Sequence, residues 1–283
     1  MGFIMNDENN GKLYVCATPI GNLEDITLRV LRVLREVDLI AAEDTRHTLQ
    51  LLNHYGIKTP LTSYHEHNKG KKGRQIVDKL LNGLSLALVT DSGMPGISDP
   101  GYELISICHE EGIPVTICPG ATAGISGLVL SGICPRRYVF EGFLPREGRQ
   151  RKEALATLVK EYRTVVLYEA PHRLVVTLSD LLESLGERKA ATVREITKKF
   201  EEVRKGNLTD LIRHYEENIP RGEFVIVLEG SSKSDNADYP KDLTEHVEYH
   251  LINGLDEKDA MKKAAKDRGI SKSEVYSMYK LKK

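Results

Sequence analysis

The feature that most constrains the fold is a regular alternation of short apolar runs with amphipathic segments. In the first half we expect strands at 13–17, 38–42, 84–90 and 114–118, and helices at 26–37, 46–55, 74–82, 101–111 and 121–131. The pattern restarts after Cys134, with strands expected at 138–143, 164–168, 190–194 and 223–229, and helices at 150–162, 173–185 and 207–215. Strands that alternate with helices predict α/β domains built on mostly parallel sheets covered on both faces.

The domain organisation follows from this restart and from the 283-residue length, which favours two domains with a small appendage. We expect an N-terminal tail at 1–11, an N-terminal α/β domain at 12–136 and a second α/β domain at 137–230. Residues 231–240 have linker composition, and 241–283 are predicted to form a small helical domain with helices at 243–252, 258–268 and 272–279.

The charge balance conceals a local asymmetry. Forty Lys and Arg against 41 Asp and Glu sum to −1. Residues 260–283 hold eight basic and two acidic residues, a local +6, which leaves 32 basic and 39 acidic residues, or −7, for the rest. A basic C-terminal appendage predicts contact with a polyanion such as RNA, with a solvated charged face as the alternative.

Location can also be argued from composition. Residues 1–11 lack the pattern of a signal peptide, and the uncharged stretch 112–135 is broken by prolines and glycines, which favours a strand, a loop and a buried helix over a membrane span. The four cysteines show no CxxC spacing and lie in apolar surroundings. We therefore expect a cytoplasmic protein with reduced thiols and no membrane segment.

Loops of unusual residues follow four of the predicted strands, at 18–22, 43–46, 91–101 and 119–123, and all but 43–46 contain both Gly and Pro. Because ligands bind at the carboxyl ends of parallel strands, four such loops predict a small-molecule site, although each alone could be an ordinary turn. The sequence lacks GxGxxG after a strand, GxxxxGK[ST] and GxSxG, so dinucleotide, P-loop and α/β-hydrolase sites are not supported.

Several motifs occur together in a fixed order. They are Tyr14–Thr27 (YVCATPIGNLEDIT), AEDTR at 42–46, SYHEHN at 63–68, 91–101, PGATA at 119–123, YVFEGFLP at 138–145, YEAPHR at 168–173 and REITKKFEE at 194–202. This set resembles the 16S ribosomal RNA ribose 2′-O-methyltransferase branch of the tetrapyrrole methylase family, over about 12–230 and the helical tail.

The resemblance implies two α/β domains with S-adenosylmethionine bound in the cleft between them, and a homodimer. It also implies methylation of the ribose 2′-hydroxyl of a cytidine in the decoding region of the small-subunit rRNA. Carried over to this chain, the cofactor-binding residues are Pro19, Gly93, Met94, Ile97, Thr122, Ala123, Leu144 and Ala170. Tetrapyrrole-acting relatives commonly have an acidic residue where this chain has Met94, which favours the rRNA branch.

The proton acceptor for such a transfer stays open among Asp44, His65, Asp99 and Glu195. Our hypothesis is that the ribose side is lined by Asp44 and Arg46 together with His65 and Asn68. Each has a structural alternative. Asp99 before Pro100 is typical of a helix start, Glu195 could pair with Arg194 or Lys198, and Arg46 could pair with Asp44. His65 and His67 have no third ligand in sequence, so we expect no metal.

The predicted RNA-binding residues lie around one strand–helix connection and in the tail. They are Arg136, Arg137, Arg146, Arg149, Arg151, Lys152, Lys272 and Lys280. The expected partner is 16S rRNA or the small ribosomal subunit. Two other functions remain open: a methyltransferase acting on a tetrapyrrole or other small molecule, and a non-enzymatic RNA-binding adaptor on the same fold.

Overall fold

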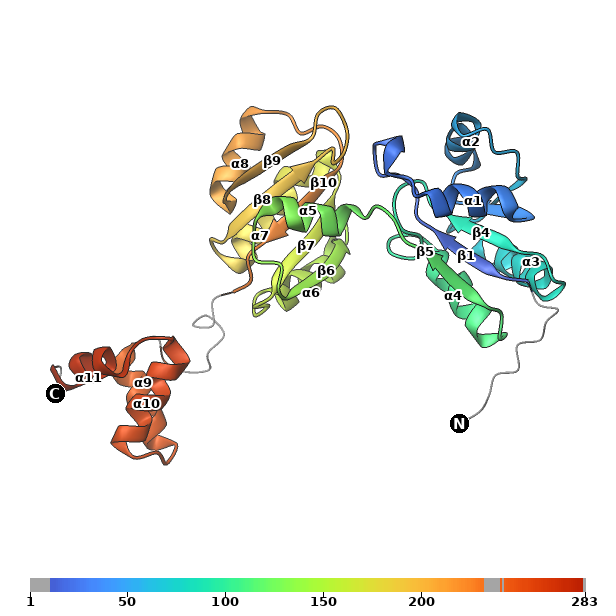
Figure 1. Ribbon diagram of the computed structural model, residues 1–283. Coiled ribbons are helices and arrows are strands. Elements are labelled where there is room, and N and C mark those ends of the chain that lie inside the picture. The colour runs from blue at the N-terminus through green and yellow to red at the C-terminus, as the bar shows by residue number, and fades with distance from the viewer. Residues whose placement is uncertain (1–10, 232–239, 241, 282–283) are drawn as a thin grey trace. The chain divides into compact units, whose positions relative to one another are not determined.

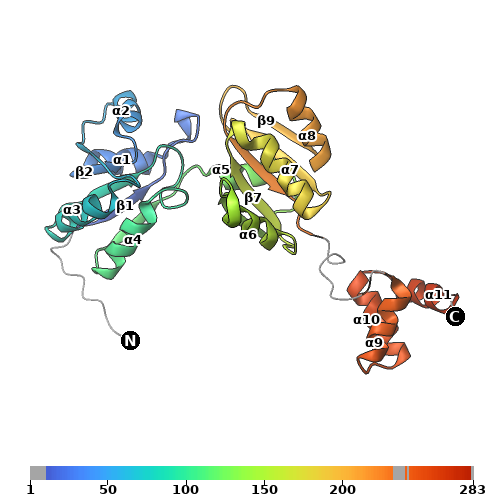
Figure 2. The ribbon, with the colours of Figure 1, turned by 180° about the vertical axis from the view of Figure 1, so that it is seen from behind.

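The computed structural model describes residues 11–231, 240 and 242–281 (Figures 1 and 2). The chain divides into two compact units. The first unit runs to Leu130 and includes Val193–Val203, whereas the second comprises Ser131–Thr192 and the chain from Arg204 on. The expected linker at 231–240 and the tail at 1–11 lie almost entirely outside the described residues.

The first unit contains a five-stranded sheet of order β3-β2-β4-β1-β5, and all four pairs of neighbouring strands are parallel. Its strands are β1 (Leu13–Cys16), β2 (Leu39–Ala42), β3 (Leu61–Ser63), β4 (Leu86–Val89) and β5 (Val115–Cys118). The connecting helices are η1 (Leu23–Asp25), α1 (Leu28–Glu36), α2 (Thr45–His54), α3 (Lys69–Leu81) and α4 (Gly101–Glu110), and α5 (Ala123–Ser131) follows β5.

Both faces of this sheet are buried, as the apolar strands predict. Leu86 and Leu88 of β4 pack in one core cluster with residues of α3 and α4. Ala87 and Val89, which point the opposite way, pack in another with residues of α1 and α2. Because successive side chains of a strand alternate between faces, a strand covered on both sides needs a continuous apolar run.

The second unit contains a mixed sheet of order β6-β7-β10-β8-β9. β6 is parallel to β7, and β10 is antiparallel to β7. The strands are β6 (Tyr138–Phe143), β7 (Thr164–Glu169), β8 (Lys189–Arg194), β9 (Glu202–Asn207) and β10 (Phe224–Leu228). Its helices are α6 (Gly148–Leu158), η2 (Pro171–Arg173), α7 (Leu174–Leu185) and α8 (Leu208–Glu217). The predicted α/β class is confirmed in both units.

Three elements differ from the sequence expectation. The strands β3 and β9 were not expected, because β3 has only three residues and β9 (EVRKGN) has no buried residue to produce an apolar signal. Both lie at sheet edges. The helix α3 begins at Lys69, earlier than predicted, and its first turns contain two glycines. One of them, Gly73, is buried, and a Cβ added to it would lie 3.7 Å from the Tyr64 ring. Tertiary packing overrides the low helix propensity of glycine there.

Three further helices follow in the C-terminal part: α9 (Leu243–Ile252), α10 (Glu257–Arg268) and α11 (Lys272–Leu281). They enclose a small core of their own, formed by Val247, Ala260, Ala264, Ala265, Val275 and Tyr279. Arg268 donates from Nη2 to the carbonyls of Pro240 (2.7 Å) and Asp242 (2.9 Å), which ties the end of α10 to the start of α9. Among the described residues, no helix is long and apolar enough to cross a membrane.

Candidate functional site

Three of the predicted ligand loops meet at Gly93. The Thr18 N–H donates to the Gly93 carbonyl (2.9 Å), and the Gly93 N–H donates to the Thr18 carbonyl (3.2 Å). Gly93 has φ +84°, and a Cβ there would lie 3.3 Å from Ile20 Cγ2 and 3.4 Å from the Ala121 oxygen. The loops after β1, β4 and β5 therefore converge on one backbone position that only glycine fits well.

Other contacts hold the same loops together. The buried Thr18 hydroxyl donates to the Thr90 carbonyl (3.0 Å), and the Ala17 N–H donates to the Cys118 carbonyl (3.1 Å). A Cβ on Gly120 would approach the Ala17 side chain to 2.8 Å. The predicted residues Pro19, Gly93, Met94, Ile97 and Thr122 lie in these loops, and the predicted residue Ala123 begins α5 directly after the third loop.

The remaining two cofactor candidates belong to the second unit. Leu144 is buried, and its carbonyl accepts from Arg173 Nη2 (2.8 Å). Ala170 follows β7, and its N–H donates to Glu169 Oε1 (2.8 Å).

The loop after β2 joins the same edge of the first sheet. The Thr90 hydroxyl donates to Glu43 Oε2 (2.6 Å), and the Asp44 N–H donates to Asp91 Oδ1 (3.0 Å). Asp91 was not among the predicted site residues. Burial raises the pKa of its carboxyl, the hydrogen bond from the Asp44 N–H opposes this rise, and the neighbouring Glu43 carboxylate adds to it. Its place directly after β4 is the signal that could have identified it.

Asp44 and Arg46 form a bidentate ion pair. Arg46 donates from Nε to Oδ1 (3.1 Å) and from Nη2 to Oδ2 (2.6 Å), and Asp44 Oδ1 also caps α2 by accepting from the Arg46 N–H (2.8 Å). The hydrogen bonds from Arg46 hold the pKa of Asp44 far below its usual range. Such a carboxylate is a weak base, so the pair is better suited to orientation than to proton transfer.

His65 and Asn68 are held together by reciprocal hydrogen bonds. The His65 N–H donates to Asn68 Oδ1 (2.9 Å), and Asn68 Nδ2 lies 3.2 Å from His65 Nε2 and 3.1 Å from Ser63 Oγ. An amide N–H at Nε2 places the proton of the neutral ring on Nδ1. That buried Nδ1 has no hydrogen-bond partner among the described residues.

Asp99 has a structural role. Its Oδ1 accepts from the N–H groups of Gly96 (2.9 Å) and Gly101 (2.8 Å), closing the turn that precedes α4. Pro100 rather than Asp99 occupies the cap position itself. Burial raises the pKa of this carboxyl.

Glu195 lies in the loop between β8 and β9. The sequence predicted this loop to lie in the second domain, but Val193–Val203 belongs to the first compact unit. Glu195 (φ +50°) and Thr197 (φ +66°) both adopt left-handed backbone, which strains residues that have a Cβ. Lys198 Nζ lies 3.0 Å from Glu195 Oε1. A Cβ on Gly21 would lie 2.5 Å from Lys198 Cγ and 2.9 Å from the Ile196 carbonyl, so this strained loop packs directly on the loop after β1.

The predicted RNA-binding residues divide by exposure. Arg136, Arg137, Arg146, Arg149 and Lys152 are exposed. Arg151 is buried, with hydrogen bonds to Asp180 Oδ2 (2.7 Å), the Pro145 carbonyl (2.9 Å) and Thr177 Oγ1 (3.0 Å). Its guanidinium is satisfied within the protein interior, and we do not include it in the proposed RNA-binding set.

The two tail candidates also differ. Lys272 is exposed, whereas Lys280 forms an ion pair with Glu257 (2.7 Å). Tyr279 lies in the core of the C-terminal helices, whereas Tyr276 is exposed.

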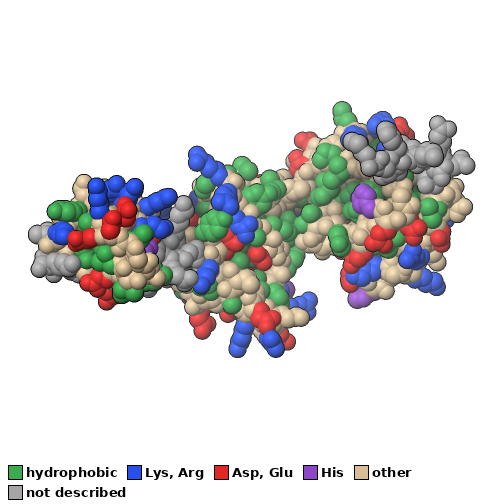
Figure 3. All heavy atoms as spheres, turned by 90° about the horizontal axis from the view of Figure 1, so that it is seen from below, with side chains coloured by type: hydrophobic (Ala, Val, Ile, Leu, Met, Phe, Trp, Pro, Cys, Tyr) green, Lys and Arg blue, Asp and Glu red, His purple; other side chains and the backbone are tan. Residues whose placement is uncertain are grey.

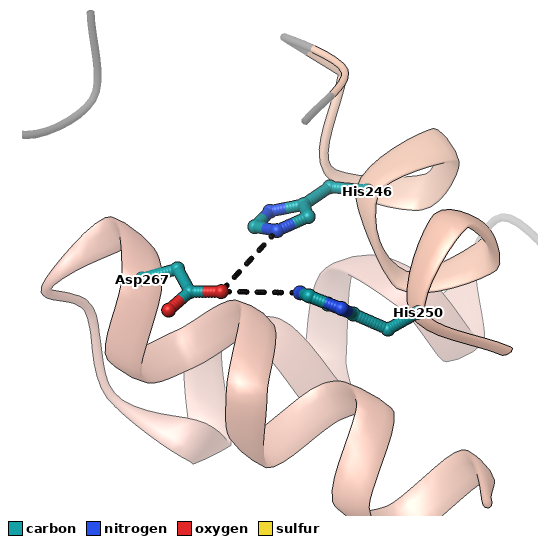
Figure 4. Close-up of side chains that lie close together, drawn as sticks. All are labelled: His246, His250 and Asp267. Carbon is teal, nitrogen blue, oxygen red and sulfur yellow. Dashed lines mark hydrogen bonds and ion pairs between the residues drawn. The ribbon is translucent and has the colours of Figure 1, made fainter. Parts of the chain in front are cut away.

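One cluster in the described part of the chain has metal-ligand composition: His246, His250 and Asp267 (Figure 4). His250 Nε2 lies 3.1 Å and His246 Nε2 lies 3.7 Å from Asp267 Oδ2. Arg268 Nε donates to His246 Nδ1 (2.9 Å), which places the proton of the neutral ring on Nε2. A protonated Nε2 offers no lone pair to a cation, so the cluster acts as a hydrogen-bonded link between α9 and α10.

The first unit has a parallel sheet whose carboxyl edge carries loops suited to ligand binding, and the second unit has a mixed sheet. This combination is typical of two-domain α/β enzymes that bind a small molecule through loops. The family model for tetrapyrrole (corrin/porphyrin) methylases matches residues 12–212, and the chain belongs to this family.

Relatives and solved structures agree with this assignment. The protein named ribosomal RNA small subunit methyltransferase I of Bacillus subtilis is 46% identical over 277 residues, covering 96% of this chain and 95% of that protein. The protein of the same name from Halalkalibacterium halodurans is 45% identical over 279 residues, covering 96% of both chains. The structure of a cobalt precorrin-4 methyltransferase matches with TM-score 0.58 and 17% identity over 77% of this chain and 94% of that one, which shows the shared fold.

Proposed function

We propose that this protein transfers a methyl group from S-adenosylmethionine to the ribose 2′-hydroxyl of a cytidine in the decoding region of the small-subunit rRNA. The convergence of three loops at Gly93 carries the proposal, because it builds a backbone-lined site at the carboxyl edge of the sheet. Full-length relatives that share nearly half of their residues with this chain, and whose names specify the ribosomal RNA small subunit, support the choice of substrate.

The residues present fit the cofactor. Pro19, Met94, Ile97 and Ala123 offer apolar surface for an adenosyl group, and Gly93 leaves space that a Cβ would fill. In the second unit, Leu144 and Ala170 are proposed to contribute further backbone contacts. When bound, S-adenosylmethionine supplies a sulfonium-activated methyl group, so the protein must mainly align the attacking oxygen with it.

The ribose side is proposed to comprise Asp44, Arg46, His65 and Asn68. Asp44 holds Arg46 by two hydrogen bonds, which leaves the guanidinium oriented and largely exposed to bind a phosphate or a ribose oxygen. We assign His65 to this side as well, and Asn68 is a positioning residue that fixes its ring. Of the other predicted proton acceptors, Asp99 is engaged in its turn and Glu195 faces Lys198.

Exposed arginines of the second unit, namely Arg136, Arg137, Arg146 and Arg149, together with Lys152 and Lys272, are proposed to contact RNA phosphates. We also propose that the protein acts in the cytoplasm as a homodimer, which sedimentation velocity would test.

The function is tested by incubating the protein with labelled S-adenosylmethionine and 16S rRNA, small ribosomal subunits or a precorrin. Label in a ribose of the rRNA or subunit supports the proposal, whereas label in the precorrin alone refutes it. Alanine variants of Asp44, Arg46, His65 and Asn68 are assayed alongside, with cofactor affinity measured separately. Full transfer by all four variants would refute the assignment of the ribose side.

A further inference from the structure

The helix α10 carries an exposed row of lysines that no described carboxylate neutralises. Lys258, Lys262 and Lys266 are spaced at i, i+4 and i+8, so they follow one another along one side of the helix at steps of about 6 Å. All three side chains are exposed. We define these three residues as the α10 lysine row.

The core of the C-terminal helices determines which way this row points. Ala260 and Ala264 are fully buried, and each lies two positions after a lysine of the row. Two positions on a helix correspond to about 200°, so the lysines lie opposite the buried face and project into solvent. Figure 3 shows lysine and arginine side chains gathered along one edge of this helical part.

The α10 lysine row differs from the neighbouring basic residues in having no carboxylate partner among the described residues. Two of the three carboxylates on α10 are engaged elsewhere: Glu257 pairs with Lys280 (2.7 Å) and Asp267 pairs with Lys263 (2.6 Å). Of the α10 carboxylates, only Asp259 has no ion pair with a described lysine or arginine, so it adds one negative charge to the helix against the three lysines of the row. Positive charge is therefore concentrated on the row, rather than on Lys280 at the end of the chain.

We propose that the α10 lysine row binds the phosphate backbone of the RNA substrate, which makes α10 the principal RNA-docking element of the C-terminal helices. The inference rests on the proposed rRNA methyltransferase function. A row of point charges without base-reading groups provides sequence-independent affinity, while the loops of the first unit select the nucleotide.

An anionic membrane is the other partner that such a row could attract. A helix that lies in a membrane surface needs an exposed apolar face beside its basic one. The apolar face of α10 is instead buried in the core that this helix shares with α9 and α11. The geometry therefore favours RNA.

The test compares the full-length protein with the triple variant K258Q/K262Q/K266Q. A matched control, K58Q/K79Q/K160Q, removes three exposed lysines elsewhere that form no ion pair with a described residue. Binding to purified small ribosomal subunits is measured between 50 and 200 mM salt, together with methyl transfer at saturating subunits and binding to vesicles containing anionic lipid.

Three phosphate contacts correspond to a salt slope of about 2–3, because each contributes about 0.7–0.9. Over this fourfold change in salt, the wild type and the control should therefore lose about 20- to 40-fold more affinity than the triple variant. Methyl transfer at saturation should be the same in all three proteins.

Three results would overturn the inference while leaving the proposed function intact, provided that the wild type methylates rRNA. The first is a triple variant whose affinity and salt slope are unchanged. The second is a control variant that loses as much affinity as the triple variant. The third is a triple variant that loses vesicle binding but keeps subunit binding. If the wild type neither binds subunits nor methylates rRNA, the proposed function fails, and the inference fails with it.

Discussion

Acidification should weaken the C-terminal helices through His246. This side chain is fully buried, and its pKa is lowered to about 4 from an ordinary value of 6.5, first by burial and then by the Arg268 cation that donates to Nδ1. His250 and Lys263 act in the same direction, whereas Asp267 opposes them. The folded helices therefore favour the neutral ring more strongly than the unfolded chain does.

The sign and size of the effect follow from linkage. A histidine with a depressed folded pKa contributes stability that is present above 6.5 and is lost as the pH falls from 6.5 towards 4. Between pH 7 and pH 5, these two pKa values correspond to a loss of about 2 kcal/mol in the free energy of unfolding. Asp267, whose pKa lies below its ordinary value of 3.8, does not titrate in this range.

The assay is hydrogen exchange of the full-length protein at pH 7 and pH 5, followed by mass spectrometry and corrected for the intrinsic pH dependence. Peptides from 243–281 should exchange about 20- to 30-fold faster than the correction predicts at pH 5. In H246Q the amide can still accept from Arg268 but cannot titrate, so this excess should largely disappear. The control H109Q alters an exposed histidine of α4 and should retain it. An equal excess in H246Q would refute the reasoning.

Three further substitutions test the site and its support. G21A should lower methyl transfer about 100-fold by displacing the strained loop packed on it, whereas G70A, which meets open space within α3, should leave activity unchanged; equal rates for the two would contradict the packing argument. R151A should lower the free energy of unfolding by about 3–5 kcal/mol in urea titration, because it leaves buried partners uncompensated, and a loss below about 1 kcal/mol would show that solvent replaces the guanidinium. T18V should cost about 1–3 kcal/mol by leaving the Thr90 carbonyl unpaired, which the same titration measures; no change would indicate that water satisfies it.

Local patterns were sufficient for most of the secondary structure. The apolar run of β4 and the three tail helices could be located from sequence because burial on one or two faces imposes a short-range period. The ligand loops were found for the same reason, since glycine at a tight approach such as Gly93 is a local requirement of the backbone. Edge strands such as β9 bury too little to leave this signal.

The partner of each charged side chain was decided only by the tertiary structure. Net charge indicated a basic appendage, but the residues chosen from it included Lys280, which pairs with a glutamate 23 positions away. Arg151 likewise appeared to be part of an exposed arginine cluster until α7 placed Asp180 beside it. Electrostatic pairing depends on distance between segments that are remote in sequence, whereas apolar periodicity depends on neighbours a few residues apart. For that reason the strands and ligand loops could be predicted, but the unpaired lysines of α10 could not.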